Sequence, residues 1–312
     1  MNAIPSTREH LSVQDDRGDY AALSLAISAE SASDQGWSPA RLQEQLTSVV
    51  QSDAVEPWIV EHQWSPGAQI HRFQLVVPNA QAQRWSIEAL YPVLNALPST
   101  VPVVLAQAGA AASIEAVSEL AEQFPGVALP LPEPTRSMLS QRREAGYEQS
   151  TITGADPAGT IGSAATFAAL CAVMAAGAPD VQAALKAAGD PSQVALSRRT
   201  QQGSPSIEWT VITRAESSLQ ALDLVLEVLT VMAQRAQAAP EHILRFAYAN
   251  LCRAWLSPTS LVGTLAEYAA MGWGGELIQD PALVRNVSGA ELAQALGQLG
   301  RPIREVLGYP ER

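Results

Sequence analysis

The clearest hydrophobic pattern in the chain is an alternating segment followed by a long helical one, in residues 206–233. Ile207, Trp209 and Val211 alternate with the polar side chains Glu208 and Thr210, which predicts a strand with one buried face. After a polar break, apolar side chains recur at spacings of three and four residues, which predicts a helix with one apolar face. The side chains of that face are Leu219, Leu222, Leu226, Leu229 and Met232.

The same strand-then-helix pattern occurs earlier, in residues 71–97. An apolar segment at residues 73–77 is followed by a polar break and then by a helical segment with one apolar face. That face carries Ile87, Leu90, Leu94 and Leu97. Two such units in one chain predict a duplicated α+β module.

The elements around both units follow the same order, which supports the duplication. In the first half, a strand is expected at Tyr20–Ser28 and a helix at residues 39–50, with Ser38 as its cap. In the second half, a strand at residues 147–154 and a helix at residues 162–176 take the equivalent places. The remaining expected elements are strands at 58–63, 70–77 and 303–308, an apolar run at 101–105, and helices at 84–97, 113–124, 240–256, 260–272 and 288–299.

The predicted fold class is therefore α+β, with two related modules. Each module is expected to be a mainly antiparallel sheet with helices packed on one face. The expected organisation is a flexible arm at residues 1–19, an abridged N-terminal module at 20–124 and a C-terminal module at 125–312. The proline-rich residues 125–134 are expected to be a linker or the first strand of the second half.

Composition and charge exclude one class of partner but do not identify a function. The chain has 312 residues, 47% of them apolar, and a formal net charge of −12. Because no cluster of basic residues occurs, nucleic acid is not expected as a partner. The acidic charge is typical of a soluble protein surface, and attraction of basic peptides is the alternative.

The cysteines and the apolar runs suggest a compartment. Cys171 and Cys252 both lie in apolar helical segments, which is typical of small core residues in a reducing compartment rather than of a disulfide framework. No signal-peptide pattern occurs in the first thirty residues, and no apolar run reaches about 18 residues. We therefore expect a cytoplasmic protein that does not span a membrane.

The C-terminal order of motifs resembles that of a known family. Pro240 and Glu241 open a helix, residues 257–260 precede another helix, and a Val-Ser-x-x-Glu-Leu segment at 287–292 opens the last helix. An apolar strand then ends in Gly-Tyr-Pro at residues 308–310. This order resembles the C-terminal domain of the pitrilysin-type (inverzincin) zinc peptidases, which include the mitochondrial processing peptidase. The resemblance implies a duplicated α/β module that forms half of a clam shell.

The resemblance also implies where zinc chemistry would lie. The family binds zinc through an H-x-x-E-H motif on a helix of the N-terminal domain, and the equivalent helix here is residues 39–50. That helix contains no histidine, so no metal ligand and no catalytic residue are expected in this chain. The chain's four histidines are His10, His62, His71 and His242. His62 and His71 flank a turn, where either a hairpin metal site or solvated or hydrogen-bonded histidines would fit.

The family's substrate-gripping arginine implies one candidate contact. The family carries it on an L-R-x-x-x-G-x-x-Y pattern, and the matching residues here are Arg198, Arg199 and Gly203. The tyrosine position falls around residues 204–206, which contain no tyrosine. Arg198 and Arg199 are therefore the predicted substrate-binding residues, with a solvated surface charge as the alternative. A similar pattern at residues 142–147 lies before the helix rather than after it, so we take that match as a coincidence.

These features predict a non-catalytic subunit of a heteromeric pitrilysin-type zinc metallopeptidase. Its partners would be a zinc-bearing homologous subunit, or a second copy of itself, and a peptide substrate. It would need no cofactor of its own, because the zinc would lie in the partner chain. The alternatives are a structural or assembly protein that keeps the peptidase fold, and an enzyme with unrecognised chemistry.

Overall fold

A computed structural model gives the architecture of most of the chain. It describes residues 8–28, 38–51, 59–65, 70–126, 149–155, 161–189, 193–201, 204–214, 218–299 and 305–307. The chain divides into two compact units. Unit 1 comprises Met1–Leu131 and Leu251–Asp280, and unit 2 comprises Pro132–Asn250 and Pro281–Arg312.

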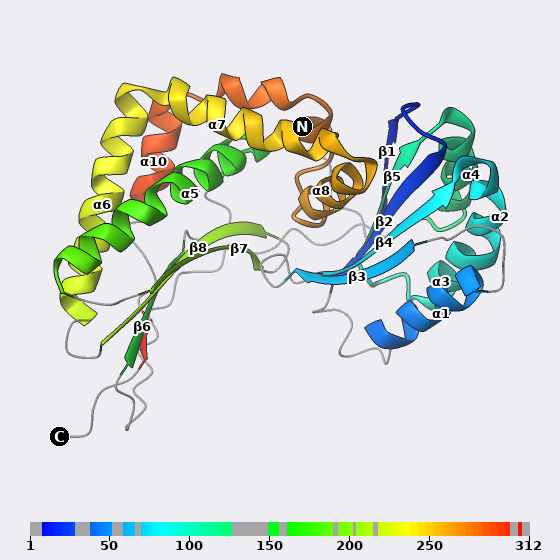
Figure 1. Cartoon of the computed structure of the whole chain (residues 1–312), viewed down its shortest axis with the longest axis horizontal. Coiled ribbons are helices and arrows are strands. Elements are labelled where there is room, and N and C mark those ends of the chain that lie inside the picture. Colours follow the sequence, from blue (N-terminus) through cyan, green and yellow to red (C-terminus); the bar gives the residue numbers. More distant parts are fainter. Residues whose placement is uncertain are drawn as a thin grey trace. The chain divides into compact units, whose positions relative to one another are not determined.

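Unit 1 contains a five-stranded sheet in the order β1-β5-β2-β4-β3 (Figure 1). The pair β1 and β5 is parallel, and the other pairs are antiparallel. The strands are β1 (Arg8–Gln14), β2 (Tyr20–Ser28), β3 (Ile59–Ser65), β4 (Ile70–Pro78) and β5 (Val103–Gly109). The helices from the first part of the chain are α1 (Pro39–Gln51), η1 (Asn79–Gln81), α2 (Ala82–Trp85), η2 (Ser86–Leu90), α3 (Tyr91–Ala96) and α4 (Ala111–Glu122).

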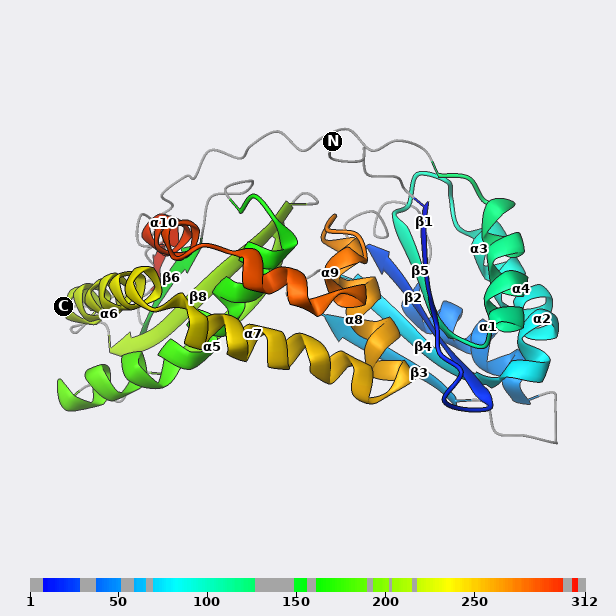
Figure 2. The same cartoon turned by 90° about the horizontal axis from the view of Figure 1, so that it is seen from above.

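Unit 2 contains a four-stranded antiparallel sheet in the order β7-β8-β6-β9. Its strands are β6 (Gln149–Ala155), β7 (Gln193–Gln201), β8 (Ser204–Arg214) and β9 (Glu305–Leu307). Its helices are α5 (Ala164–Ala187), α6 (Ser218–Ala238), α7 (Pro240–Arg253), η5 (Pro281–Asn286) and α10 (Gly289–Leu299). The last residues of α7, after Asn250, are assigned to unit 1. α6 packs against both α5 and α10, as Figure 2 shows.

The predicted duplication is confirmed by the strand order. Read from one edge, β5-β2-β4-β3 of unit 1 corresponds to β9-β6-β8-β7 of unit 2. In both units the chain runs strand, helix, strand, strand, helix and finally the strand that pairs with the first. The fold class is α+β, as the hydrophobic patterns predict.

The two faces of the unit 1 sheet differ in side-chain size. Along β2, the large side chains Leu23, Leu25 and Ile27 alternate with the small side chains Ala22, Ser24 and Ala26, and all six are buried. The large face joins Phe73, Leu75 and residues of α1, α3 and α4 in one hydrophobic core. The face with small side chains, here called the small face, continues on β5 through Ala106 and Ala108. It leaves room for another helix or strand to pack closely against the sheet.

A helix from far along the chain covers this small face. η4 (Ala254–Leu256), α8 (Pro258–Ala270) and α9 (Glu276–Gln279) belong to unit 1, and α8 contacts β2, β4 and β5 on the side opposite α1–α4 (Figure 1). Arg72 Nη1 donates to the carbonyl oxygen of Gly263 at 3.1 Å, and Gln74 Nε2 donates to that of Thr259 at 3.1 Å. A Cβ at Gly263 would lie 2.5 Å from Gln74 Nε2, so only glycine permits this approach without a shift.

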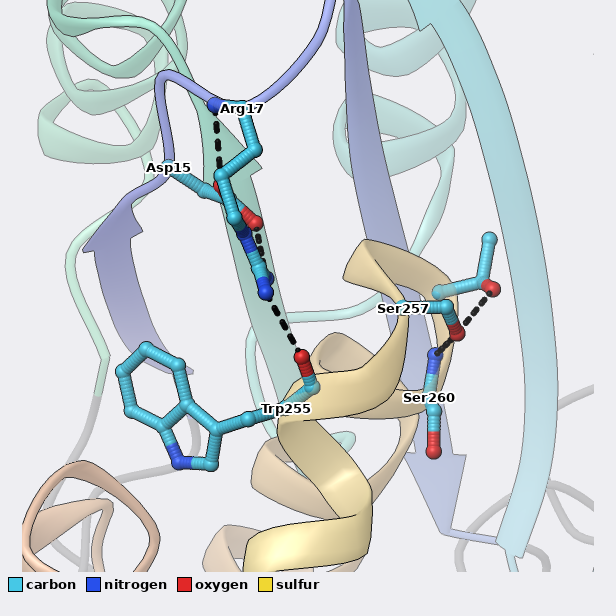
Figure 3. A network of polar contacts seen from close by, with 6 residues as sticks. Asp15, Arg17, Trp255, Ser257 and Ser260 are labelled. Carbon is cyan, nitrogen blue, oxygen red and sulfur yellow. Dashed lines mark hydrogen bonds and ion pairs between the residues drawn. The ribbon is translucent and has the colours of Figure 1, made fainter.

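A second polar contact holds the start of this segment. Arg17 Nη1 donates to the carbonyl oxygen of Trp255 at 2.8 Å, while the same guanidinium binds the buried carboxylate of Asp15 (Figure 3). The hydrogen bonds from Arg17 lower the pKa of Asp15, although burial opposes them. Ser257 then caps α8, because its Oγ accepts from the backbone N–H of Ser260 at 3.1 Å (Figure 3).

The structure corrects the expected domain organisation at two places. Residues 8–14 are not a loose arm, because they form β1 and pair with β5 along seven residues. Residues 251–280 lie in unit 1, so a single break near residue 124 does not describe the chain. In both cases the segment is placed by a sheet whose strands come from distant parts of the chain. β1 pairs with β5, and α8 packs on β2, β4 and β5. Residues 127–134 of the expected linker lie outside the described part of the chain.

Several local expectations can also be compared. Ser288 and Glu291 form a capping box at the start of α10, because Glu291 Oε2 accepts from the Ser288 backbone N–H at 2.8 Å and Ser288 Oγ accepts from the Glu291 backbone N–H at 3.2 Å. The helix expected at 84–97 is broken into α2, a π-helical turn at η2 and α3. Cys171 and Cys252 do not form a disulfide bond.

Within the described residues, α5 is long and apolar enough by length and composition to cross a membrane. This differs from the expectation that no segment reaches that apolar length. Of its most apolar window, 56% is buried inside the chain, and α5 contacts α6, α10 and β7. Its contacts are those of a core helix of unit 2.

Gly263→Val tests the close approach of α8. We expect this substitution to lower the free energy of unfolding by about 1–3 kcal/mol, because the added side chain displaces Arg72 and Gln74. Gly18→Val is the control, since a Cβ at Gly18 meets nothing within 4 Å, and we expect a change of no more than about 0.5 kcal/mol. Urea denaturation of both variants measures the difference. Equal stability of the two variants would contradict the packing described for α8.

Candidate functional site

The helix that would carry a zinc motif is present as α1. It follows β2 and precedes β3, and it packs against β3, η2 and α3. Leu42 and Leu46 are buried in the core of unit 1, whereas Arg41 and Glu44 are exposed. The spacing of four between the two leucines fixes which side of the helix faces the sheet. The helical support of the site is thus retained.

The chemistry of the zinc motif is missing from this helix. α1 reads PARLQEQLTSVVQ and contains one carboxylate, Glu44, and no histidine. The chain contains no H-x-x-E-H sequence at any position. Among the described residues, no group of three or more His, Cys, Asp and Glu side chains could hold a metal ion.

The structure brings His62 and His71 together on neighbouring strands. His62 Nε2 and His71 Nδ1 lie 3.1 Å apart, so one imidazole N–H donates to the other ring. His62 lies on β3, opposite Phe73 in the register of β4, and His71 lies opposite Trp64. This geometry confirms the hydrogen-bonded histidines among the alternatives for the hairpin.

Aromatic rings surround this histidine pair. The His62 ring lies 4.9 Å from the Phe73 ring, and the Trp64 ring lies 4.6 Å from the His71 ring, measured between centroids. Burial lowers the pKa of His71, and a charge on His62 lowers it further. His71 therefore favours its neutral form, in which its Nδ1 can accept the hydrogen bond from His62 or donate it.

The predicted substrate-binding residues lie on a strand that the hydrophobic pattern does not reveal. Arg198 and Arg199 belong to β7, where they pair in register with Ile207 and Ser206 of β8. β7 stands at the end of the strand order of unit 2. Gly203 of the pattern and residues 142–147 of the similar pattern lie outside the described residues. A role of Arg198 and Arg199 in substrate binding stays a prediction.

Comparisons with known proteins address the fold. No family model matches the chain, and no curated protein matches its sequence. In structure, it is similar to an inactive domain of an M16 peptidase from Pseudomonas fluorescens, with a TM-score of 0.62 and 13% identity, covering 97% of this chain and 96% of that one. It is also similar to a chain of complex III2 from Candida albicans, with a TM-score of 0.58 and 9% identity, covering 98% and 96%.

A third structural neighbour is much longer than this chain. The periplasmic protease PqqL from Escherichia coli has a TM-score of 0.57 and 12% identity, and the match covers 95% of this chain but 43% of PqqL. These similarities confirm at the level of the fold the resemblance to pitrilysin-type peptidases. The chain is a protein with the M16 peptidase fold that lacks the H-x-x-E-H motif.

His62→Ala tests the electrostatic account of the histidine pair. In the wild-type protein we expect His71 to titrate below its ordinary pKa of 6.5, and in the variant its pKa rises because the neighbouring charge is removed. NMR titration of the imidazole signals measures both values. A pKa of His71 that falls or stays constant in the variant would disprove this cause.

The lowered pKa also has a consequence for stability. The folded protein binds the proton on His71 less tightly than the unfolded chain does. The stability that this group contributes is therefore fully present above pH 6.5 and is lost as the pH falls through the folded pKa.

Proposed function

We propose that this protein is a non-catalytic subunit of a heteromeric pitrilysin-type zinc metallopeptidase. It would complete the chamber around the substrate and help to bind the peptide, while a zinc-bearing homologous chain performs the cleavage. The observation that carries this proposal is α1, which keeps its place between β2 and β3 but carries no histidine. A fold retained without its metal ligands is suited to structural and binding roles.

The length comparison supports a two-chain arrangement. This chain covers less than half of PqqL, so a single protease chain of that fold has room for a second part of similar size. In the proposed complex, a separate chain with the H-x-x-E-H motif supplies that second part. The zinc would lie in the partner, and this chain would hold no cofactor. Two cysteines that form no disulfide bond support the proposed cytoplasmic location.

The proposed contact with the peptide lies on β7. Arg198 and Arg199 are adjacent residues at the end of the strand order in unit 2, and their guanidinium groups can donate several hydrogen bonds to peptide carbonyls. The chain's net charge of −12 further favours basic peptides over acidic ones.

A second candidate function is assembly without proteolysis. The similarity to a chain of complex III2, over 96% of that chain, favours this alternative, because the fold occurs there in a large assembly. In that case this protein would bind a homologous chain and leave its peptidase activity unchanged.

Co-expression with the H-x-x-E-H-bearing chain encoded nearest to it separates the two functions. We expect the pair to cleave a fluorogenic peptide library at least roughly tenfold faster than the zinc-bearing chain alone, because charge-assisted contacts to substrate contribute about 1.5–3 kcal/mol. Complex formation without a gain in cleavage would favour the assembly role. A mixture that neither associates nor gains activity would exclude both functions.

Substitution of the two arginines tests the proposed peptide contact. Arg198→Ala combined with Arg199→Ala is expected to raise KM roughly tenfold without changing co-elution with the partner, as expected when substrate binding is lost. Arg245→Ala is the control, since Arg245 is an exposed arginine of the same unit on α7. An equal effect of the control and the double variant would remove the role assigned to Arg198 and Arg199.

A further inference from the structure

Unit 1 contains a cavity of about 140 Å³ between the edge of its sheet and the helices beside it. β1 and β5 form one side of the cavity, and α3 and the end of α4 form the other. Its apolar lining includes Leu94, Val103, Leu105 and Phe124. The Phe124 ring packs against the Tyr91 ring, with 5.4 Å between their centroids, so an oriented aromatic side chain forms part of the wall.

The register of β1 on β5 places His10 on the face of the sheet that α3 and α4 cover. His10 is paired with Leu105, and residues directly paired across two strands extend to the same face. Leu105 belongs to the hydrophobic core on that face, and His10 itself borders the cavity. Glu9 also borders the cavity, but it is paired with Val104 and extends to the opposite face.

His10 has hydrogen-bonding capacity that the described residues do not use. Its Nε2 is shielded from solvent, and no group in the described part of the chain forms a hydrogen bond with it. A buried polar atom without a partner destabilises the folded state, so a ligand that provides a partner is favoured at this position. Every edge of an imidazole presents a nitrogen in one of two ring orientations, which half a turn of the ring exchanges. The ring can therefore present a nitrogen to the cavity without movement of the backbone.

The charges around the cavity favour a neutral ligand. Burial lowers the pKa of His10, and the charge of Glu122 on α4 opposes this effect. Burial also raises the pKa of the Glu9 carboxyl, so its charged form is poorly solvated. Glu9 and Glu122 would repel an anion, and the guanidinium of Arg8, which also borders the cavity, would repel a cation.

The size and lining of the cavity define the ligand. A cavity of about 150 Å³ lined by aliphatic and aromatic side chains is large enough for benzene. A hydroxyl group can both donate and accept a hydrogen bond, so it matches either nitrogen of a neutral imidazole. We propose that this cavity binds a small neutral phenol, with its ring among the apolar side chains and its hydroxyl hydrogen-bonded to His10.

Other ligand classes fit this cavity less well. Phosphate and sugars carry several polar groups, and the apolar walls would leave most of these groups without partners. The site is separate from the histidine pair on β3 and β4 and from the arginines on β7. It does not depend on a zinc-bearing partner.

Calorimetry with phenol and benzene on the full-length chain tests the proposal. In an apolar cavity without a polar partner, the buried hydroxyl would make phenol bind at least roughly tenfold more weakly than benzene. With the hydroxyl bound to His10, we expect phenol to bind at least as tightly as benzene. Weaker binding of phenol than of benzene, or no saturable binding of phenol, would overturn the proposal.

His10→Leu removes the hydrogen bond and keeps an apolar wall. We expect this variant to bind phenol at least roughly tenfold more weakly than the wild-type protein, while its affinity for benzene changes by no more than about threefold. His242→Leu, on an exposed histidine of α7, is the control and should change neither affinity. A His10→Leu variant with wild-type affinity for phenol would contradict the assigned hydrogen bond.

NMR of the wild-type chain tests the position of the ligand independently of whether the variant folds. Because the hydroxyl binds the imidazole, phenol should shift the ring signals of His10 and leave those of His242 in place. Nuclear Overhauser contacts between phenol and Phe124 are expected for a ring inside the cavity. Phenol binding that leaves the His10 signals unchanged would place the ligand elsewhere and disprove the assignment.

Discussion

The packing of α8 on the small face of the unit 1 sheet is the constraint on which that unit depends. Ala22, Ser24 and Ala26 leave room for a helix at close range, and Gly263 lets the two backbones approach. Arg72 binds the Gly263 carbonyl across 191 residues of sequence. α8 thus covers the small face of the central strands, while the large face packs with α1, α3 and α4 in one hydrophobic core. The position of α1 follows from that core.

The contrast between a retained scaffold and missing chemistry explains the proposed function. Leu42 and Leu46 keep α1 in place, and their burial contributes to stability whether or not the helix binds zinc. Zinc binding through an H-x-x-E-H motif would require two histidines on this helix, and it has none. Elsewhere in the unit, His62 and His71 are hydrogen-bonded to each other.

The hydrophobic pattern predicts much of this fold, and the same strand-then-helix pattern occurs in both modules. Alternating Leu23, Leu25 and Ile27 identify β2, and the leucines of α6 identify a helix with one buried face. The absence of the zinc motif is also readable from the sequence, since it depends on a few residue types at fixed spacing. Local patterns of this kind need no knowledge of the partner segment.

The elements that the pattern misses are defined by distant partners. β1 is polar in sequence, and its Arg8 donates a hydrogen bond to the carbonyl oxygen of Leu97 at the end of α3. β7 carries two adjacent arginines in a strand that pairs with β8. Assignment of residues 251–280 to unit 1 depends on the small face of a sheet formed far earlier in the chain. The His62 and His71 contact arises from the β3–β4 register, which the spacing of two histidines does not determine.

The most direct test of the proposed function is native mass spectrometry of this chain co-expressed with the zinc-bearing homologous chain that we propose as its partner, with the zinc content of each species counted. We expect a complex that contains both chains, in which all zinc is lost when the histidines of the partner's motif are replaced. Stoichiometric zinc on this chain alone, or two chains that remain separate at high concentration, would contradict it.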